Sequence, residues 1–441
     1  MNHIAIIGAG YSGALQAINL LRFGTARITL IERAERPARG AAYSTSYPDH
    51  LLNVRAAKMS AFADTQDHFA NWLAARGQGD GATFAERRLY GTYLEELLAA
   101  AGDAAGGRLR IIKGEAVSVT RDGSGETIGL ADGESLQADA VILSVGNLPP
   151  ERPRVISPEL PDDLYVADPW AGDITSGLSD SDQMILIGTG LTAIDAALML
   201  DAAGFKGRIL ALSRRGLVPR AHEAGPHSVP DLAQEPIDTL SHLLASVRRS
   251  AAAIGWPSAV DQLRPHTQAL WSAAPVDRRR RFLRHLRPWW DVHRHRIAPE
   301  IAARIAAMEA EGRLSFQAGK LVSTSLRGEG AELVWRPRGS GQTEVLLVRR
   351  IVNCTGPQGD LARAGEPLLR QLLQDGRVRA DPCRIGIDVD AKCRVLDSNG
   401  SPSASLYAIG PMTRGALWEI VAVPDLRLQT HQLAQTLSLP A

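Results

Sequence analysis

The sequence predicts an α/β protein made of two Rossmann-like dinucleotide-binding domains, with a helical insert in the second. A short apolar run followed by a glycine-rich turn occurs twice, at residues 3–13 and 184–193. Each copy continues into a segment with helical spacing and then into a second apolar run. A third observation is the length of 441 residues, which exceeds one ordinary core and leads us to expect two or three domains.

The first copy begins with His3–Ile7, an apolar run too short for a helix. Glycines then follow at G-x-G-x-x-G spacing, before a helix-like stretch of small residues from 14 to 21. In this arrangement Gly8 permits the turn, Gly10 lets the backbone approach a pyrophosphate, and Gly13 lets the helix pack on the strand. The helix N-terminus also offers unpaired N–H groups to an anion. The alternative is that the glycines are only steric.

An acidic residue strengthens the interpretation as a nucleotide site. The second apolar run, Arg27–Glu32, ends in an acid that lies 22 residues after Gly10. A ribose hydroxyl needs an acceptor at this place in a dinucleotide-binding domain. The sequence therefore predicts a bound dinucleotide in the N-terminal copy.

The first copy continues through a long excursion and a series of short elements. We expect the loop from 33 to 47 and its continuation to residue 62 to line the cofactor, because long loops inside compact domains are often functional; the alternative is a surface loop without ligand contact. Helical spacing follows at 67–73 and 88–101, and short strands begin at 107. The copy closes with the continuous apolar strand 138–147, and the Pro-rich segment 149–169 predicts a domain boundary.

The second copy repeats this plan. The strand 184–187 leads into the turn 188–193, a helix over 194–200 and a strand over 208–213. Two further segments repeat the first copy: 312–317 corresponds to 107–109, and 350–356 corresponds to the strand that ends at Gly146. We interpret the chain as an internal duplication of one nucleotide-binding plan. Two copies imply two dinucleotides, or one prosthetic dinucleotide and one that diffuses.

A helical insert, roughly 237–311, interrupts the second copy, and its section from Arg278 to Arg296 is basic and aromatic. Such a pattern is compatible with nucleic-acid binding. Lys+Arg of 49 against Asp+Glu of 48 argues against that reading. The other two interpretations are a basic cap over a phosphate-bearing cofactor and a structural helix pair with a solvated basic face.

In the cap interpretation, the insert folds back over the cleft between the two domains and controls substrate access. Trp289 and Trp290 would then form apolar walls, and Arg287, Arg294 or Arg296 would orient an anion. In the structural interpretation, the tryptophans pack the insert against its own domain and the arginines are solvated.

The last part of the chain is expected to return to the first domain. Residues 405–410 predict a strand ending in glycine, 411–419 a loop, and 424–437 a helix that begins with proline, where a helix tolerates it best. The predicted domains are therefore 1–160 (first part of the first domain), 161–356 (second domain with its insert) and 357–441 (return to the first domain).

Other features of the sequence exclude several classes of protein. The strand that begins within three residues of the start leaves no room for a signal peptide, and no apolar run is long enough for a membrane span, so we expect a cytoplasmic protein without a membrane partner. Cys354, Cys383 and Cys393 form no C-x-x-C and no zinc spacing, which predicts neither a disulfide framework nor a metal site. Nothing in the sequence indicates the oligomeric state.

Two nucleotide-binding copies, each closed by a strand ending in glycine, together with a final Tyr-Ala-Ile-Gly strand and a terminal helix, resemble the two-dinucleotide-binding-domain flavoproteins. Within them, the segments His50–Val54, Ser213–Gly216 and Gly410–Glu419 resemble a bacterial family of FAD/NAD(P)-binding proteins. The resemblance spans most of the chain. It implies FAD in the N-terminal copy and a nicotinamide dinucleotide in the second, and it names no substrate.

Departures from the relatives narrow the expected activity. Disulfide reductases of this fold carry a redox cysteine pair beside the flavin, and this sequence has none. Their last strand usually ends Gly-Asp, whose acid binds the flavin ribitol, whereas Pro411 follows Gly410 here. This favours flavin monooxygenases, several of which also lack the acid. The Baeyer–Villiger core and the F-A-T-G-Y signature of amine N-hydroxylases are absent, so the monooxygenase prediction rests on fold-level analogy.

The nicotinamide cofactor is predicted to be NADPH. Ser213 takes the position of Glu32 in the repeat, and Arg214 and Arg215 follow it. An acid there would repel a 2′-phosphate, whereas the planar guanidinium group of arginine can donate hydrogen bonds to it. In the alternative, these arginines are solvated.

The leading expectation is an NADPH-dependent FAD monooxygenase that incorporates O2 into a small molecule. The alternatives are an NADPH-flavin reductase or electron-transfer flavoprotein, and a non-enzymatic FAD-binding redox sensor. Catalytic candidates on the flavin side are Asn53, Arg414 and Trp418. The residues predicted to bind the cofactors are Gly8, Gly10, Tyr11, Ser12, Gly13, Glu32, Arg33, Asn53, Met59, Ser60, Val117, Gly146, Asn147, Gly188, Thr189, Gly190, Leu191, Thr192, Ser213, Arg214, Arg215, Thr355, Gly356, Gly410 and Pro411.

Overall fold

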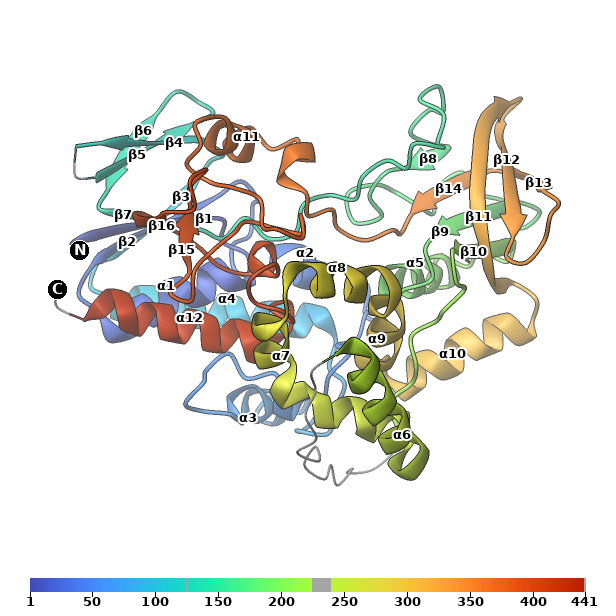
Figure 1. Cartoon of the computed structure of the whole chain (residues 1–441), viewed down its shortest axis with the longest axis horizontal. Helices are drawn as coiled ribbons and strands as arrows, with labels where there is room; N and C mark the ends of the chain where they lie inside the picture. Colours follow the sequence, from blue (N-terminus) through green and yellow to red (C-terminus); the bar gives the residue numbers. More distant parts are fainter. Residues whose placement is uncertain (124, 224–238, 440–441) are drawn as a thin grey trace.

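The computed structural model describes residues 1–123, 125–223 and 239–439. The molecule has two halves, and each contains a sheet whose central strands run parallel and which is surrounded by helices (Figure 1). Most helices of the insert lie between the two halves, near the C-terminal helix, whereas the last one, α10 (Pro299–Ala310), lies in the second half beside its sheet.

The first sheet has the order β15-β16-β7-β1-β2-β3 and is parallel except for its edge strand β15. Buried aliphatic runs form its centre, as expected for strands covered on both faces. A small antiparallel sheet, β4-β5-β6, lies beside it. The strands are β1 (His3–Ile7), β2 (Arg27–Glu32), β3 (Leu109–Lys113), β4 (Ala116–Asp122), β5 (Gly125–Leu130), β6 (Ser135–Ala138), β7 (Ala140–Leu143), β15 (Arg394–Leu396) and β16 (Pro402–Ala408).

The second sheet has the order β13-β12-β11-β10-β9-β14-β8. The five strands from β11 to β8 run parallel, and β12 and β13 extend the sheet as an antiparallel meander that sequence analysis did not predict. These strands are β8 (Tyr165–Val166), β9 (Gln183–Ile187), β10 (Arg208–Ser213), β11 (Leu314–Arg327), β12 (Gly330–Pro337), β13 (Glu344–Val348) and β14 (Arg350–Asn353).

The strand pairings repeat between the two sheets. β1 pairs in parallel with β2 and β7, and β9 pairs in parallel with β10 and β14. In each copy a glycine turn and a helix follow the first strand, α1 (Tyr11–Phe23) after β1 and α5 (Leu191–Ala202) after β9. The predicted α/β class with two Rossmann-like units is confirmed.

Helices cover the faces of both sheets. In the first half, α1 packs against α4 (Arg87–Ala104) and α12 (Val423–Ser438), which confirms the terminal helix. The predicted helix at 67–73 is α3 (His68–Ala74). The loop at 33–47 contains α2 (Gly40–Tyr43), and α11 (Pro367–Gln374) packs against β4; sequence analysis predicted neither helix. The 3-10 turns are η1 (Ala56–Lys58), η2 (Arg264–His266), η3 (Leu361–Arg363) and η4 (Pro411–Thr413).

The described part of the insert is helical, as predicted, whereas Ile237 lies outside the described residues. Gly255, with φ of +81°, interrupts α6 two residues before Pro257. Proline lacks a backbone N–H and its ring clashes with the preceding turn, so a regular helix does not continue through it. None of the described helices is long and apolar enough to cross a membrane. The insert helices are α6 (Leu240–Leu263), α7 (Thr267–Ala273), α8 (Val276–His285), α9 (Arg287–Arg294) and α10 (Pro299–Ala310).

Candidate functional site

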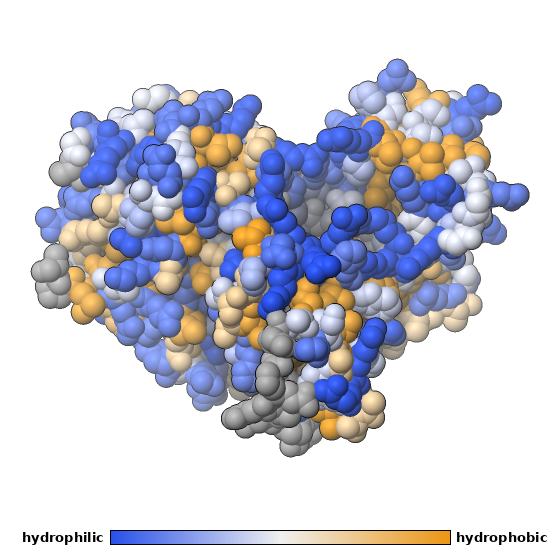
Figure 2. Space-filling model, in the orientation of Figure 1, coloured by the Kyte–Doolittle hydropathy of each residue, from blue (hydrophilic) through white to orange (hydrophobic). Residues whose placement is uncertain are grey.

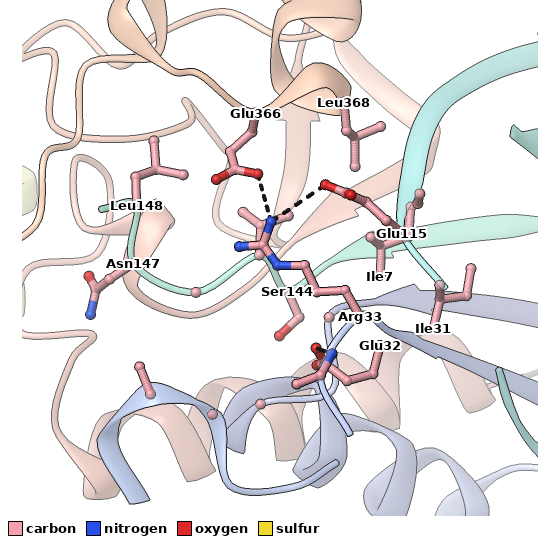
Figure 3. Close-up of a pocket in the computed structure, with 18 of the residues that line it drawn as sticks. Ile7, Ile31, Glu32, Arg33, Glu115, Ser144, Asn147, Leu148, Glu366 and Leu368 are labelled. Carbon is pink, nitrogen blue, oxygen red and sulfur yellow. Dashed lines mark hydrogen bonds and ion pairs between the residues drawn. The ribbon is translucent and has the colours of Figure 1, made fainter. Parts of the chain in front are cut away.

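The first pocket lies at the carboxyl ends of β1, β2 and β7 and has a volume of about 380 Å³ (Figure 3). Ligands of open parallel sheets bind at this edge, and the volume is in the range of small-molecule sites. The predicted residues that line it are Gly8, Gly10, Glu32, Arg33, Gly146 and Asn147. Residues 33, 34, 36, 40, 41 and 44 bring the long loop after β2 into the same wall.

Glu32 is held in place by its own backbone surroundings. Its Oε2 accepts a hydrogen bond from the Ala9 amide at 2.6 Å, and its Oε1 accepts one from the Ala34 amide at 2.9 Å. Each carboxylate oxygen can accept a second hydrogen bond. Glu32 therefore presents fixed acceptor capacity to a ribose.

The glycines of the first turn have different steric roles. A Cβ at Gly8 would lie 2.2 Å from the Ser144 carbonyl oxygen, and one at Gly13 would lie 1.9 Å from the Gly8 carbonyl oxygen. A Cβ at Gly10 would meet Gly40 Cα at 3.4 Å, so a wider residue would narrow the passage between the turn and α2. Gly146, with φ of +69°, faces open space. The turn leaves room for a backbone-bound pyrophosphate.

The far wall of this pocket was not predicted from the sequence. Arg33 pairs with Glu366 at 3.0 Å and with Glu115 at 3.5 Å, across the opening seen in Figure 3. Glu366 directly precedes α11, and Pro367, Leu368 and Leu369 of that helix also line the pocket. Only the tertiary structure brings this segment, more than 300 residues from Arg33, to the nucleotide cradle.

Several predicted cofactor residues lie elsewhere. The Tyr11 ring is buried and stacks with Tyr90, Met59 is in the apolar core, and the Ser60 hydroxyl donates to the carbonyls of Phe62 and Thr65. The remaining predicted residues that do not line the described pockets are Ser12, Gly13, Asn53, Val117, Gly410 and Pro411. Their cofactor roles stay predictions.

Ser12 and Gly410 nevertheless meet at the first turn. A Cβ at Gly410, whose φ is +81°, would lie 2.9 Å from the Ser12 hydroxyl oxygen. This contact brings the loop after the last strand against the start of α1. The Asn53 carbonyl accepts a hydrogen bond from His222 at 2.9 Å, which joins the first excursion to the second half of the chain.

The second pocket is larger, about 900 Å³, and lies at the carboxyl ends of β9, β10 and β14. A Cβ at Gly190 would meet nothing within 4 Å, so the space over this turn is open to a phosphate. All ten residues predicted for the second copy line the pocket: Gly188, Thr189, Gly190, Leu191, Thr192, Ser213, Arg214, Arg215, Thr355 and Gly356.

The insert forms the opposite wall of the second pocket. Residues of α8, α9 and their junction line it, together with Arg338 at the end of the β12 hairpin: Leu283, Arg284, His285, Arg287, Pro288, Asp291, Val292 and His295. Arginines outnumber the single acid, Asp291, which suits a ligand with several phosphates. The space-filling view shows a hollow with hydrophilic surroundings between the two halves (Figure 2).

The two arginines after β10 differ in their contacts. Arg215 donates to the carbonyl oxygens of His285 at 3.1 Å and Arg284 at 3.3 Å, which are unpaired groups at the end of α8. Among the described residues, Arg214 has no hydrogen-bond or ion-pair partner. Arg214 is therefore the freer of the two to bind a 2′-phosphate, while Arg215 holds the insert.

The expectations for the insert need correction. Arg296 is buried and donates to Asp261 at 2.9 and 3.1 Å inside the insert, so it orients no ligand, and Arg294 pairs with Glu419 at 3.1 Å. Trp289 is 47% exposed, so the expectation that it forms an apolar wall is wrong. The alternative, in which these arginines are solvated, is also wrong for Arg294 and Arg296. A carboxylate already pairs with each of them, and this pairing also prevents them from binding an anionic ligand.

Burial shifts the titration of the groups in this wall. The Asp291 side chain is 39% exposed but lines the second pocket, and desolvation by the surrounding protein raises its pKa despite Arg287 at 3.3 Å. Burial lowers the pKa of His295, and the nearby Glu419 carboxylate opposes that shift. His295 is therefore mostly neutral at pH 7.

Arg414 and Trp418 lie in the loop after η4. Burial and then Arg287 lower the pKa of Arg414 to about 10, and its Nε donates to the Ile385 carbonyl at 2.9 Å. Trp418 stacks on Trp271 of α7 with 4.5 Å between the ring centroids and lines a separate apolar cavity of about 130 Å³ in the insert. The catalytic roles of Asn53, Arg414 and Trp418 stay predictions.

Fold and site together define a protein with two dinucleotide-type pockets, each at the carboxyl edge of a parallel sheet. A family model described as FAD-NAD(P)-binding matches residues 5–148, which confirms the predicted FAD/NAD(P)-binding domain around the first pocket. None of the curated proteins compared is significantly similar in sequence.

Solved structures share the whole fold at low sequence identity. Ornithine N-hydroxylase from Kutzneria sp. 744, with reduced FAD, NADP+ and L-ornithine, is 13% identical with a TM-score of 0.66, over 99% of each chain. L-lysine 6-monooxygenase from Pseudomonas syringae is 17% identical with a TM-score of 0.66, over 99% of each chain. Thioredoxin reductase from T. acidophilum is 13% identical with a TM-score of 0.55, over 99% of this chain and 98% of that one. The predicted fold with two dinucleotide-binding units is confirmed.

Proposed function

We propose that this protein is an FAD-dependent, NADPH-using monooxygenase that acts on a small molecule. The observation that carries the proposal is the pairing of two pockets in one chain, with the second pocket enclosed by a basic wall from the insert. The fold, shared along the whole length with ornithine and lysine hydroxylases, supports it.

In this proposal FAD binds the first pocket, in a domain made of residues 1–160 and 357–441. Glu32 accepts hydrogen bonds from the adenosine ribose, and the turn from Gly8 to Gly13 receives the pyrophosphate. Bound FAD would accept a hydride from NADPH and pass electrons to O2. The part of the chain is to hold the two cofactors and exclude water.

NADPH would bind the second pocket, in a domain made of residues 161–356. The N-terminus of α5 after Gly190 suits the pyrophosphate, and Arg214 suits the 2′-phosphate because no other described residue binds its side chain. Arg284 and Arg287 add positive charge from the insert side. Thr355 and Gly356, at the end of β14, lie at the same edge.

Amines are the first substrates to test, because the similar solved structures include hydroxylases of ornithine and lysine. NADPH oxidation is measured in air with and without each candidate amine, and products are analysed by mass for one atom of labelled oxygen from 18O2. We expect at least one substrate to stimulate NADPH oxidation and to gain one oxygen.

These measurements, together with reduction of the bound FAD by NADPH in the absence of oxygen, distinguish the alternative functions. Rapid oxidation of NADPH with a full yield of hydrogen peroxide and no oxygenated product from any substrate would identify a flavin reductase. Bound FAD that NADPH fails to reduce without oxygen would favour a redox sensor. The Gly10→Val protein, which we expect to lack FAD, is the background control.

A further inference from the structure

Glu419 has an unusual backbone and an unusual environment. It is not a glycine, yet its φ is +67°, a left-handed conformation that costs free energy for a residue with a side chain. Its side chain is only 2% exposed. A buried carboxylate in a strained position persists only where surrounding contacts compensate for both costs.

Those contacts come from one helix of the insert. Glu419 Oε1 accepts a hydrogen bond from the Trp290 indole at 2.8 Å, and Oε2 forms an ion pair with Arg294 Nε at 3.1 Å that lacks hydrogen-bond geometry. The His295 ring lies 4.0 Å from Oε1. Trp290 and Arg294 belong to α9, and His295 directly follows it. The loop before α12 therefore contacts α9 through a single carboxylate.

Helix α9, which Glu419 contacts, also forms part of the wall of the second pocket. Arg287, Asp291 and His295 line that pocket. They lie at the start of α9, in its middle and directly after its end, so their positions depend on how the helix is placed. Other parts of the insert have separate anchors to the C-terminal part of the chain. Arg264 pairs with Asp425, and the Trp271 indole donates to the Gly415 carbonyl at 2.8 Å, and both anchors act on segments before α8.

We propose that Glu419 is a positioning residue for the pyridine nucleotide: its carboxylate seats α9 so that the basic wall closes on the second pocket. The inference rests on the proposed function, because it assumes NADPH in that pocket. Glu419 itself is not among the residues that line the pocket, so it acts through α9.

Two variants separate the carboxylate from the backbone. Glu419→Gln keeps the side-chain shape and an oxygen that accepts from Trp290, but it loses the charge opposite Arg294. Glu419→Gly removes the side chain and relieves the left-handed conformation, which glycine adopts readily. Asp425→Asn is the matched control, because its direct ion pair is with Arg264, before α7, and its carboxylate acts on Arg294 of α9 only as a more distant charge.

The dissociation constant of NADP+ is measured by titration calorimetry on FAD-loaded protein, together with FAD content, melting temperature, and KM and kcat for NADPH oxidation. Losing a charge-assisted contact that orders the pocket should raise the dissociation constant about tenfold in both Glu419 variants. KM for NADPH should rise with it, while kcat at saturating NADPH and FAD content stay near wild-type values. Asp425→Asn should bind NADP+ as the wild type does.

Wild-type affinity in both Glu419 variants would overturn the inference while leaving the proposed function intact. An equal loss of affinity in Asp425→Asn would also overturn it, because general loosening of the insert would then explain the effect. Failure of the wild type itself to bind NADP+ would overturn the proposed function and this inference together.

Discussion

Arg87, the first residue of α4, donates two hydrogen bonds to the carboxylate of Asp195 in α5, at 2.8 and 3.1 Å. The pair joins a helix of the first half to the helix that follows the second cradle. The two side chains are 16% and 8% exposed, so the bond forms with little water around it. The interface between the halves thus contains a buried, bidentate ion pair.

Removing one partner of this pair should destabilise the protein strongly. For Asp195→Ala we expect a loss of about 3 kcal/mol in the free energy of unfolding, because the largely buried Arg87 charge keeps only the Leu51 carbonyl as a partner. Denaturant unfolding measures it. Asp64→Ala breaks the more exposed Arg22–Asp64 pair and should cost at most about 1 kcal/mol. Equal losses in the two variants would show that the buried pair has no special weight.

The two glycine turns allow a crossed test of the cofactor sites. Gly10→Val should abolish FAD binding, because its branched side chain would fill the passage beside Gly40. Gly190→Val should keep the yellow FAD-bound form but lose NADP+ binding, because its side chain projects into the space left for the pyrophosphate. Absorbance spectra and NADP+ titrations measure both. Full FAD in purified Gly10→Val would refute the assignment of the first pocket.

Arg214 should determine the choice between NADPH and NADH. We expect the wild type to prefer NADPH by roughly tenfold to several thousandfold in kcat/KM, from one or two charge-assisted bonds to the 2′-phosphate. Arg214→Ala should lose most of that preference by weakening NADPH alone. Arg215→Ala should affect both nucleotides, because Arg215 holds the end of α8. Equal efficiency of the wild type with NADH and NADPH would exclude the idea.

Arg296 should act on stability and not on nucleotide binding. Its side chain is 5% exposed and bonds to Asp261, which is 33% exposed. For Arg296→Ala we expect a loss of about 3 kcal/mol, at the low end for a buried pair because the lone Asp261 can partly hydrate. Thermal unfolding measures the change. An unchanged melting temperature with a raised KM for NADPH would restore a ligand-binding role.

His50 should contribute to acid sensitivity. Its ring is buried between Thr45 Oγ1 at 2.7 Å and the Asp195 carbonyl at 3.2 Å, and burial lowers its pKa below 6.5. Below pH 6.5 His50 binds a proton in the unfolded chain but not in the folded protein. The free energy of unfolding therefore falls as the pH falls, until the pH reaches the pKa of His50 in the folded protein. The raised pKa values of Asp291 and Asp381 act in the opposite direction at acidic pH.

Comparison with His50→Gln isolates this contribution. Between pH 6.5 and 5 the wild type should lose stability faster than the variant, by at most about 1.4 kcal/mol per pH unit. Denaturant unfolding at several pH values measures the difference. Parallel pH profiles of the two proteins would exclude His50 as the source.

The sequence by itself determined the two nucleotide cradles. Strands such as His3–Ile7 and glycines at G-x-G-x-x-G spacing have local causes, namely a buried apolar run and a backbone that must turn tightly. Glu32 is the last residue of β2 and Arg214 directly follows β10, so their places at the pocket edges were predictable from where the strands end in the sequence. For the same reason all ten residues predicted for the second copy line one pocket.

Only the tertiary structure decided what the long-range partners do. Arg215, Arg294 and Arg296 look alike in the sequence as basic residues near a cofactor, yet one holds a helix end and two pair with carboxylates. Glu366 and Glu419 carry no local motif, and their roles arise because distant segments meet them. A side chain's charge can be read from the sequence, but its partner depends on packing between elements that are 35 to 333 residues apart in these cases. The partner decides whether the charge binds a ligand or holds the fold.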